Sequence, residues 1–157
     1  MSTARANANQ SLYLAKILLD GWRAALEGEA VPVLSLQRAF LPGVQAHLRQ
    51  SYGWFLLEIV DLDTPPGVSP PANAAALPPV AEGTAESGEL RECMQLEQSG
   101  WLSSLLTNHS SQSVHQPRSS GNLANAAAPA GDFAEAVEWS VQLEKMMSRM
   151  RDSLDEY

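Results

Sequence analysis

The chain has 157 residues, which is long enough for one hydrophobic core and short for two domains. Eighteen acidic and ten basic residues give a formal net charge of −8, and residues 61–157 hold fourteen of the acids against five of the bases. An acidic surface repels phosphate backbones and anionic lipids, so the composition argues against binding to nucleic acid or to a membrane surface.

The first helix is predicted over residues 9–27. Its apolar residues recur at steps of three and four, which is typical of a helix that packs one face on a neighbour: Leu12, Ala15, Leu19, Trp22 and Leu26. Asn9 or Ser11 would cap its start, and Gly28 would end it. Because glycine inside a helix costs about 1 kcal/mol relative to alanine, Gly21 indicates a close approach by another helix.

The second helix is predicted over residues 41–62, and it either begins near Leu41 or is kinked at Pro42. Its first half is amphipathic, whereas its second half carries apolar side chains on every side, including Trp54, Phe55, Leu56, Leu57 and Val60. This pattern is typical of a helix that is buried at one end. We therefore expect this helix to be the centre of the fold.

Two long connections separate the remaining helices. Residues 64–87 hold six of the ten prolines, in three Pro-Pro pairs, which favours a mobile linker. Residues 108–131 are rich in serine, asparagine and alanine and predict a second mobile loop. Between them, residues 88–107 are predicted to be helical, either as one helix or as two that are broken at Gly100, with Ser99 capping the second.

The last helix is predicted over residues 132–155 and has the most regular spacing. Asp132 and Glu135 stand in capping-box positions at its start. A seam then recurs at steps of three and four over three heptads: Phe133, Ala136, Ser140, Leu143, Met147, Met150 and Leu154. We predict that the apolar members Phe133, Leu143, Met147, Met150 and Leu154 form a surface for protein interaction or self-association.

Together these elements predict one all-α domain over residues 1–157, a small antiparallel bundle of four to five helices with two long mobile loops. The N-terminus is polar, and the apolar runs are well below the roughly 20 residues that cross a bilayer. Cys93 is the only cysteine, so no intrachain disulfide can form. These features favour a soluble cytoplasmic protein.

The sequence contains no assembled catalytic or metal-binding motif. No acidic residue stands three positions before a histidine, as the di-iron bundles require. His109 and His115 do not have zinc-ligand spacing with Cys93. The chain also lacks a Gly-x-Ser-x-Gly elbow, a P-loop and a GxGxxG motif. We therefore predict no metal, no cofactor and no catalytic residue.

One set of polar residues stands out among the apolar helices. Glu58 has the apolar neighbours Leu57 and Ile59, and His47 and Tyr52 precede it on the second helix. With Tyr13 on the first helix, a network of Tyr13, His47, Tyr52 and Glu58 would give a binding site for a small ligand. The alternative is that each side chain points outward or finds a local partner.

The chain resembles a family of short, uncharacterised helical proteins from Pseudomonas-like bacteria. Three motifs carry the resemblance: Asn9-Gln10-x-Leu12-Tyr13-x-Ala15, the run of His47-Leu48, Tyr52 and Glu58-Ile59, and Trp101-Leu102 followed by Leu105-Leu106. The Pro-rich segment and the long final helix depart from the pattern. The resemblance implies a soluble bacterial helical fold and no particular activity.

We therefore expect a non-enzymatic protein-interaction module whose partner is another protein or a second copy of the chain. The alternative is a small-ligand binder or an enzyme that uses the face formed by His47, Tyr52 and Glu58. In that case these side chains should converge on an apolar pocket.

Overall fold

The computed structural model describes residues 2–79, 83–107 and 132–157. The described residues form five α-helices and one short 3-10 helix, with no strand: α1 (Thr3–Gly28), α2 (Val33–Ile59), η1 (Ala74–Ala76), α3 (Gly88–Gln98), α4 (Trp101–Leu106) and α5 (Phe133–Asp155). The predicted all-α fold is therefore confirmed. The loop predicted over residues 108–131 lies outside the described residues.

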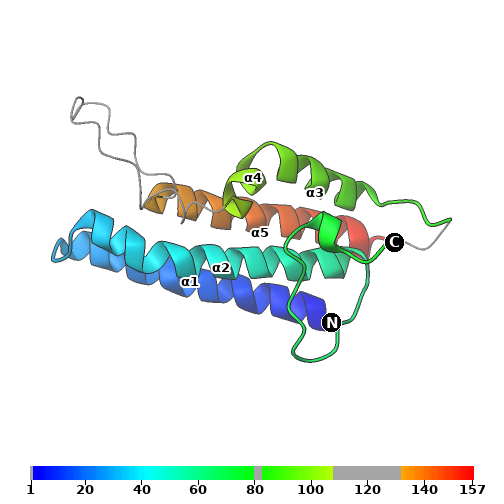
Figure 1. Ribbon diagram of the computed structural model, residues 1–157, viewed down its shortest axis with the longest axis horizontal. Coiled ribbons are helices and arrows are strands. Elements are labelled where there is room, and N and C mark those ends of the chain that lie inside the picture. Colours follow the sequence, from blue (N-terminus) through cyan, green and yellow to red (C-terminus); the bar gives the residue numbers. More distant parts are fainter. Residues whose placement is uncertain (1, 80–82, 108–131) are drawn as a thin grey trace.

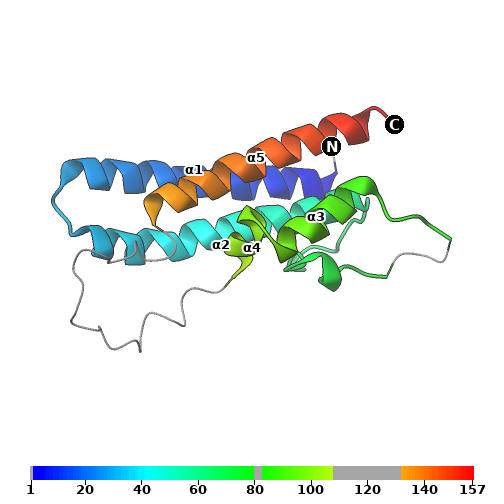
Figure 2. The same cartoon turned by 90° about the horizontal axis from the view of Figure 1, so that it is seen from above.

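The helices form an up-and-down bundle in which each long segment runs antiparallel to the one before it (Figure 1). The third segment consists of α3 and α4, which together run back along the bundle before α5 returns. Both chain ends lie at the same end of the bundle, at the N-terminus of α1 and the C-terminus of α5 (Figure 2). The hairpin between α1 and α2 is at the opposite end.

The first two helices are longer than the sequence pattern indicated. α1 is capped by Ser2, whose Oγ accepts from the backbone N of Arg5 at 3.2 Å, so the predicted caps at residues 9 and 11 were wrong. α2 begins directly after Pro32 and continues through Pro42. Pro42 and Arg38 are both exposed, so water can bond the Arg38 carbonyl that proline leaves without an N–H partner.

The later helix ends follow the pattern more closely. Asp132 caps α5, because its Oδ1 accepts from the backbone N of Glu135 at 2.8 Å. The break expected near Gly100 separates α3 from α4, and Gly100 has a φ of 130° that favours glycine. Ser99 does not cap α4, since the residue before that helix is Gly100 and no side chain caps it.

The core draws on every α-helix, with α2 at its centre. Seven residues in the second half of α2 are buried, as its all-round apolar pattern predicted: Ser51, Tyr52, Gly53, Phe55, Leu56, Leu57 and Ile59. At the hairpin end, the ring of Trp22 stacks on Phe40 at 6.0 Å and meets the edge of Phe133 at 5.2 Å. The long segments are thus joined from one end of the bundle to the other.

The Pro-rich connection is packed against α2 more closely than its composition indicated. A Cβ at Gly53 would lie 2.3 Å from the carbonyl O of Pro71 and 2.9 Å from the Cβ of Pro70. Further along the connection, Ala74 and Leu77 pack on the hydrophobic core. Only a residue without a side chain allows the backbone to cross α2 at this point.

Replacing Gly53 by alanine should therefore destabilise the protein. Alanine favours a helix interior by about 1 kcal/mol over glycine, but the clash with a backbone carbonyl should outweigh this and cost about 1–3 kcal/mol net. Urea unfolding measures the change. The matched control is Gly28→Ala, because a Cβ there meets nothing within 4 Å. Equal stability of the two variants would contradict the packing described.

Candidate functional site

The four polar residues that the sequence singled out do not form one site. Tyr13 is 64% exposed on α1, whereas Tyr52 is fully buried. His47 is half-buried, and its Nδ1 is a buried atom without a hydrogen-bond partner. His47 and Glu58 are separated by about 16 Å along the helix axis, at about 1.5 Å per residue. None of the four lines either of two cavities beside the Pro-rich connection.

Glu58 joins three helices through a nearly buried ion pair. Arg151 on α5 donates from Nε to Glu58 Oε1 at 2.9 Å and from Nη2 to Oε2 at 2.8 Å. Its third nitrogen donates to Asn9 Oδ1 on α1 at 2.8 Å, and its guanidinium lies 5.6 Å from the centre of the Phe55 ring. Since both oxygens of Glu58 bond to a fixed guanidinium, this carboxylate holds the bundle together.

Tyr52 anchors the Pro-rich connection to α2 and α3. Its hydroxyl donates to Glu97 Oε1 at 2.5 Å, and the same oxygen accepts from the backbone N of Ala74 at 2.8 Å. Burial raises the pKa of Tyr52, and the neighbouring Cys93 and Glu97 act in the same direction. Burial likewise raises the pKa of the Cys93 thiol to about 12. Both groups therefore stay protonated and are poor nucleophiles.

Stability should fall at alkaline pH because of this cluster. Below pH 9 the Cys93 thiol is protonated whether the chain is folded or not. Above its ordinary pKa of 9.0 the unfolded thiol loses its proton, while the folded one retains it up to about 12. The free energy of unfolding should therefore decline between these pH values, as urea unfolding at several pH values would show. The decline should be shallower in Cys93→Ala, and identical slopes would contradict the expectation.

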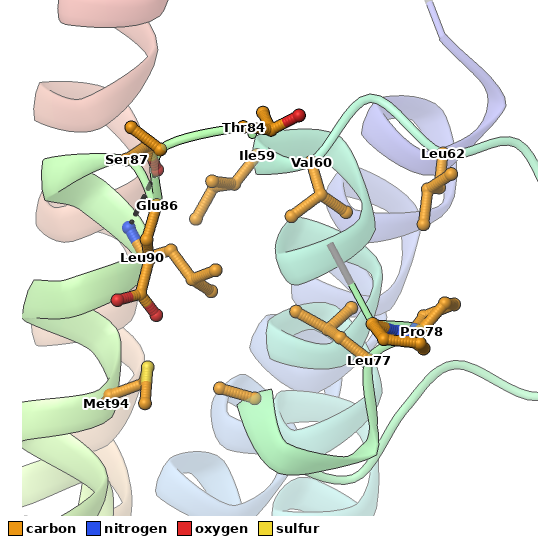
Figure 3. Close-up of a pocket in the computed structure, with 13 residues that line it drawn as sticks. Ile59, Val60, Leu62, Leu77, Pro78, Thr84, Glu86, Ser87, Leu90 and Met94 are labelled. Carbon is orange, nitrogen blue, oxygen red and sulfur yellow. Dashed lines mark hydrogen bonds between the residues drawn. The ribbon is translucent and has the colours of Figure 1, made fainter. Parts of the chain in front are cut away.

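An apolar cavity lies between the C-terminal end of α2, the segment around η1 and the start of α3 (Figure 3). Its volume of about 650 Å³ is within the range of ligand pockets. Its lining is mainly aliphatic, with three polar side chains: Ile59, Val60, Leu62, Ala74, Leu77, Pro78, Pro79, Thr84, Ala85, Glu86, Ser87, Leu90 and Met94. Ser87 is engaged as the cap of α3, where its Oγ accepts from the backbone N of Leu90 at 3.1 Å.

Two large apolar side chains at this cavity are partly open to solvent. Leu62 is 38% exposed and Met94 is 37% exposed, whereas Leu90 between α2 and α3 is buried. The sequence did not single out this cavity, because its walls come from three separate segments. Leu90 and Met94 are four residues apart on α3 and therefore lie on the same face of that helix. This spacing was the one sequence pattern that pointed to the cavity.

A second cavity of about 660 Å³ lies between α1, α2 and the first part of the Pro-rich connection. Its lining is more polar: Thr3, Asn7, Gln50, Trp54, Thr64, Pro65, Pro66, Gly67, Val68, Ser69 and Pro70. No titratable side chain is among these residues. This cavity therefore offers neither the apolar lining nor the charges that would fix a ligand strongly.

The family comparison places the chain among proteins without an assigned activity. The model of a family of unknown function (DUF6586) matches residues 1–157. The chain belongs to the DUF6586 family. This membership fits the expected resemblance to an uncharacterised family. No curated protein and no solved structure matches this DUF6586 protein.

The seam predicted on the last helix is buried inside the DUF6586 bundle. Leu143, Met147 and Met150 are at most 1% exposed, and they belong to the hydrophobic core. Phe133 and Leu154 are half-buried and pack against the same core. The middle of the seam is covered by the chain's own helices, so in the folded protein Leu143, Met147 and Met150 are not open to a partner.

No group of three potential metal-binding side chains is found among the described residues, and His109 and His115 lie outside them. Within the same residues, no helix is both long and apolar enough to cross a lipid bilayer.

Proposed function

We propose that this DUF6586 protein is a non-enzymatic protein-interaction module. Its cavity between α2, η1 and α3 receives apolar side chains of the partner. The observation that carries the proposal is the pair Leu62 and Met94, which expose large apolar surfaces beside an aliphatic cavity. Exposed apolar side chains gathered at one concave place are typical of binding sites.

The chemistry of the lining supports binding rather than catalysis. Among the described lining residues Glu86 is the single titratable side chain, and the hydroxyl of Ser87 is engaged as the cap of α3. The neighbouring Tyr52 and Cys93 are fully buried and engaged with each other and with Glu97. These groups support the wall of the cavity and do not open into it.

A pair of matched variants tests the proposal. Leu62→Glu with Met94→Glu places two charges at the cavity, whereas Val141→Glu changes an exposed side chain of similar accessibility, 37%, on α5. Each protein would be tagged in its native host, and captured proteins would be quantified by mass spectrometry. We expect a partner that is lost with the double variant and retained with Val141→Glu.

Thermal unfolding provides the control for folding, because all three substitutions concern exposed residues and should change stability little. If the double variant captures the same proteins in the same amounts as the unchanged chain, the cavity is not the binding site and the proposal is wrong.

We further propose that the protein acts in the cytoplasm of a Pseudomonas-like bacterium. The motifs of the first two helices support the source, and the single Cys93 suits a reducing compartment. Fractionation of the native host tests this, and recovery of the protein outside the cytoplasmic fraction would contradict it.

A further inference from the structure

The segments around the mouth of the cavity between α2, η1 and α3 carry three acidic residues. Glu86 lines the cavity, and Asp61 and Asp63 stand on either side of the lining residue Leu62. All three carboxylates belong to exposed residues. Among the residues that the structure describes, none of the three takes part in an ion pair.

Within the described residues, some acidic side chains elsewhere on the bundle pair with basic ones, whereas others, such as Glu27 and Glu29, do not. Glu58 pairs with Arg151, Glu92 with Arg149 and Glu144 with Lys16. The one base on α3 is Arg91, which is exposed and follows the lining residue Leu90 in the sequence. Unlike Glu58, Glu92 and Glu144, the three acidic residues near the cavity have no basic partner among the residues that the structure describes.

Three unpaired carboxylates in the segments that line an aliphatic cavity favour a particular partner chemistry. Their mutual repulsion is relieved when cations are placed at the mouth, while the lining favours apolar side chains inside. An amphipathic helix meets both needs when its apolar stripe is flanked by lysine or arginine. A neutral apolar segment would fill the cavity but would leave the carboxylates without cations.

We infer that the cavity binds a basic amphipathic helix of a partner protein. This inference rests on the proposed function, and it adds the chemistry of the partner. The apolar stripe packs on Leu62, Leu90 and Met94, and the flanking cations face Asp61, Asp63 and Glu86.

Synthetic peptides measure this preference directly. A fluorescent helical peptide of leucine and lysine is titrated with the full chain at low salt, and binding is followed by anisotropy. Its counterparts carry serine or glutamate in place of lysine. We expect the lysine peptide to bind about tenfold more tightly than the serine peptide, with the difference declining as salt rises.

Two variants with the same change in net charge separate local from general attraction. D61N/D63N/E86Q removes the charges at the mouth, and D20N/E27Q/E29Q removes three exposed charges near the hairpin, at the other end of the bundle. Asparagine tolerates the positive φ of 51° at position 61. We expect the first variant to bind the lysine peptide about tenfold more weakly, and the second to bind it about as well as the unchanged chain.

The outcomes distinguish the two proposals. If all peptides bind equally and L62E/M94E abolishes their binding, the cavity is an interaction site and the basic partner is wrong. If both triple variants weaken lysine-peptide binding equally, the attraction comes from net charge and the inference is also wrong. If no peptide binds and L62E/M94E captures the same partners as the unchanged chain, the proposed function itself fails.

Discussion

Replacing Arg151 by alanine is expected to lower the free energy of unfolding by about 3–5 kcal/mol, the usual cost of breaking a buried ion pair by removing one partner. The side chain of Glu58 is 9% exposed and that of Arg151 is 13% exposed. Without Arg151, the nearest base to Glu58 is Arg5, whose Nε is 3.6 Å from Oε1. The carboxylate of Glu58 would stay nearly buried, and only the more distant guanidinium of Arg5 would compensate its charge. Urea unfolding gives the change.

The pair between Lys16 and Glu144 provides the control. Its side chains are 41% and 52% exposed, although the distance of 2.7 Å is as short as that in the buried pair. Lys16→Ala should therefore cost no more than about 1 kcal/mol. Replacing Arg151 and Glu58 together by methionine and leucine should restore much of the stability lost in Arg151→Ala, because no charge is then left uncompensated. Equal losses in Arg151→Ala and Lys16→Ala would show that Glu58 is solvated.

The sequence pattern predicted the positions of the helices more accurately than the contacts between them. Steps of three and four placed the start of α5 within one residue of the observed Phe133. α2 was expected eight residues too late, because Pro42 was interpreted as a helix start or kink. A proline on the exposed side of a helix loses a bond that water can replace, and whether a position is exposed depends on the tertiary fold.

The Pro-rich connection shows what composition cannot supply. Its prolines and alanines indicate only that it has little to bury. Its position depends on Gly53 and on Glu97, which receives bonds from both Tyr52 and Ala74. Because these residues are distant in the sequence, no local pattern relates them. The aliphatic cavity is formed by the same arrangement and was missed for the same reason.

The four polar residues singled out in the sequence do not form one ligand site, although two of them make interactions between helices. Tyr52 and Glu58 were singled out because they are polar residues within an apolar segment, and both are indeed committed to buried interactions. Their partners were not predictable, since Glu97 and Arg151 are 45 and 93 residues away in the sequence. Tyr13 is exposed on α1. A polar residue within an apolar segment therefore indicates an interaction, but it does not show whether that interaction stabilises the fold or binds a ligand.

Leu143→Ala is expected to cost about 2–5 kcal/mol, as is usual when a buried leucine is truncated. Leu143 is fully buried in the core shared by α5 with the other long segments. The matched control is Val141→Ala, two residues away on the same helix, where the side chain is 37% exposed and the cost should be below about 0.5 kcal/mol. Urea unfolding compares the two variants.

Leu143→Ala also shows whether the heptad seam packs within one bundle or between two copies of the chain. A three-four spacing is identical whether the helix packs on its own bundle or on a second copy, because either partner presents the same kind of groove. If the seam holds the bundle together, Leu143→Ala loses stability and leaves the mass in solution unchanged at concentrations where it is folded. If the seam joined two copies, the variant would show a lower mass with its helices intact. Burial of Leu143, Met147 and Met150 within one chain favours the first result.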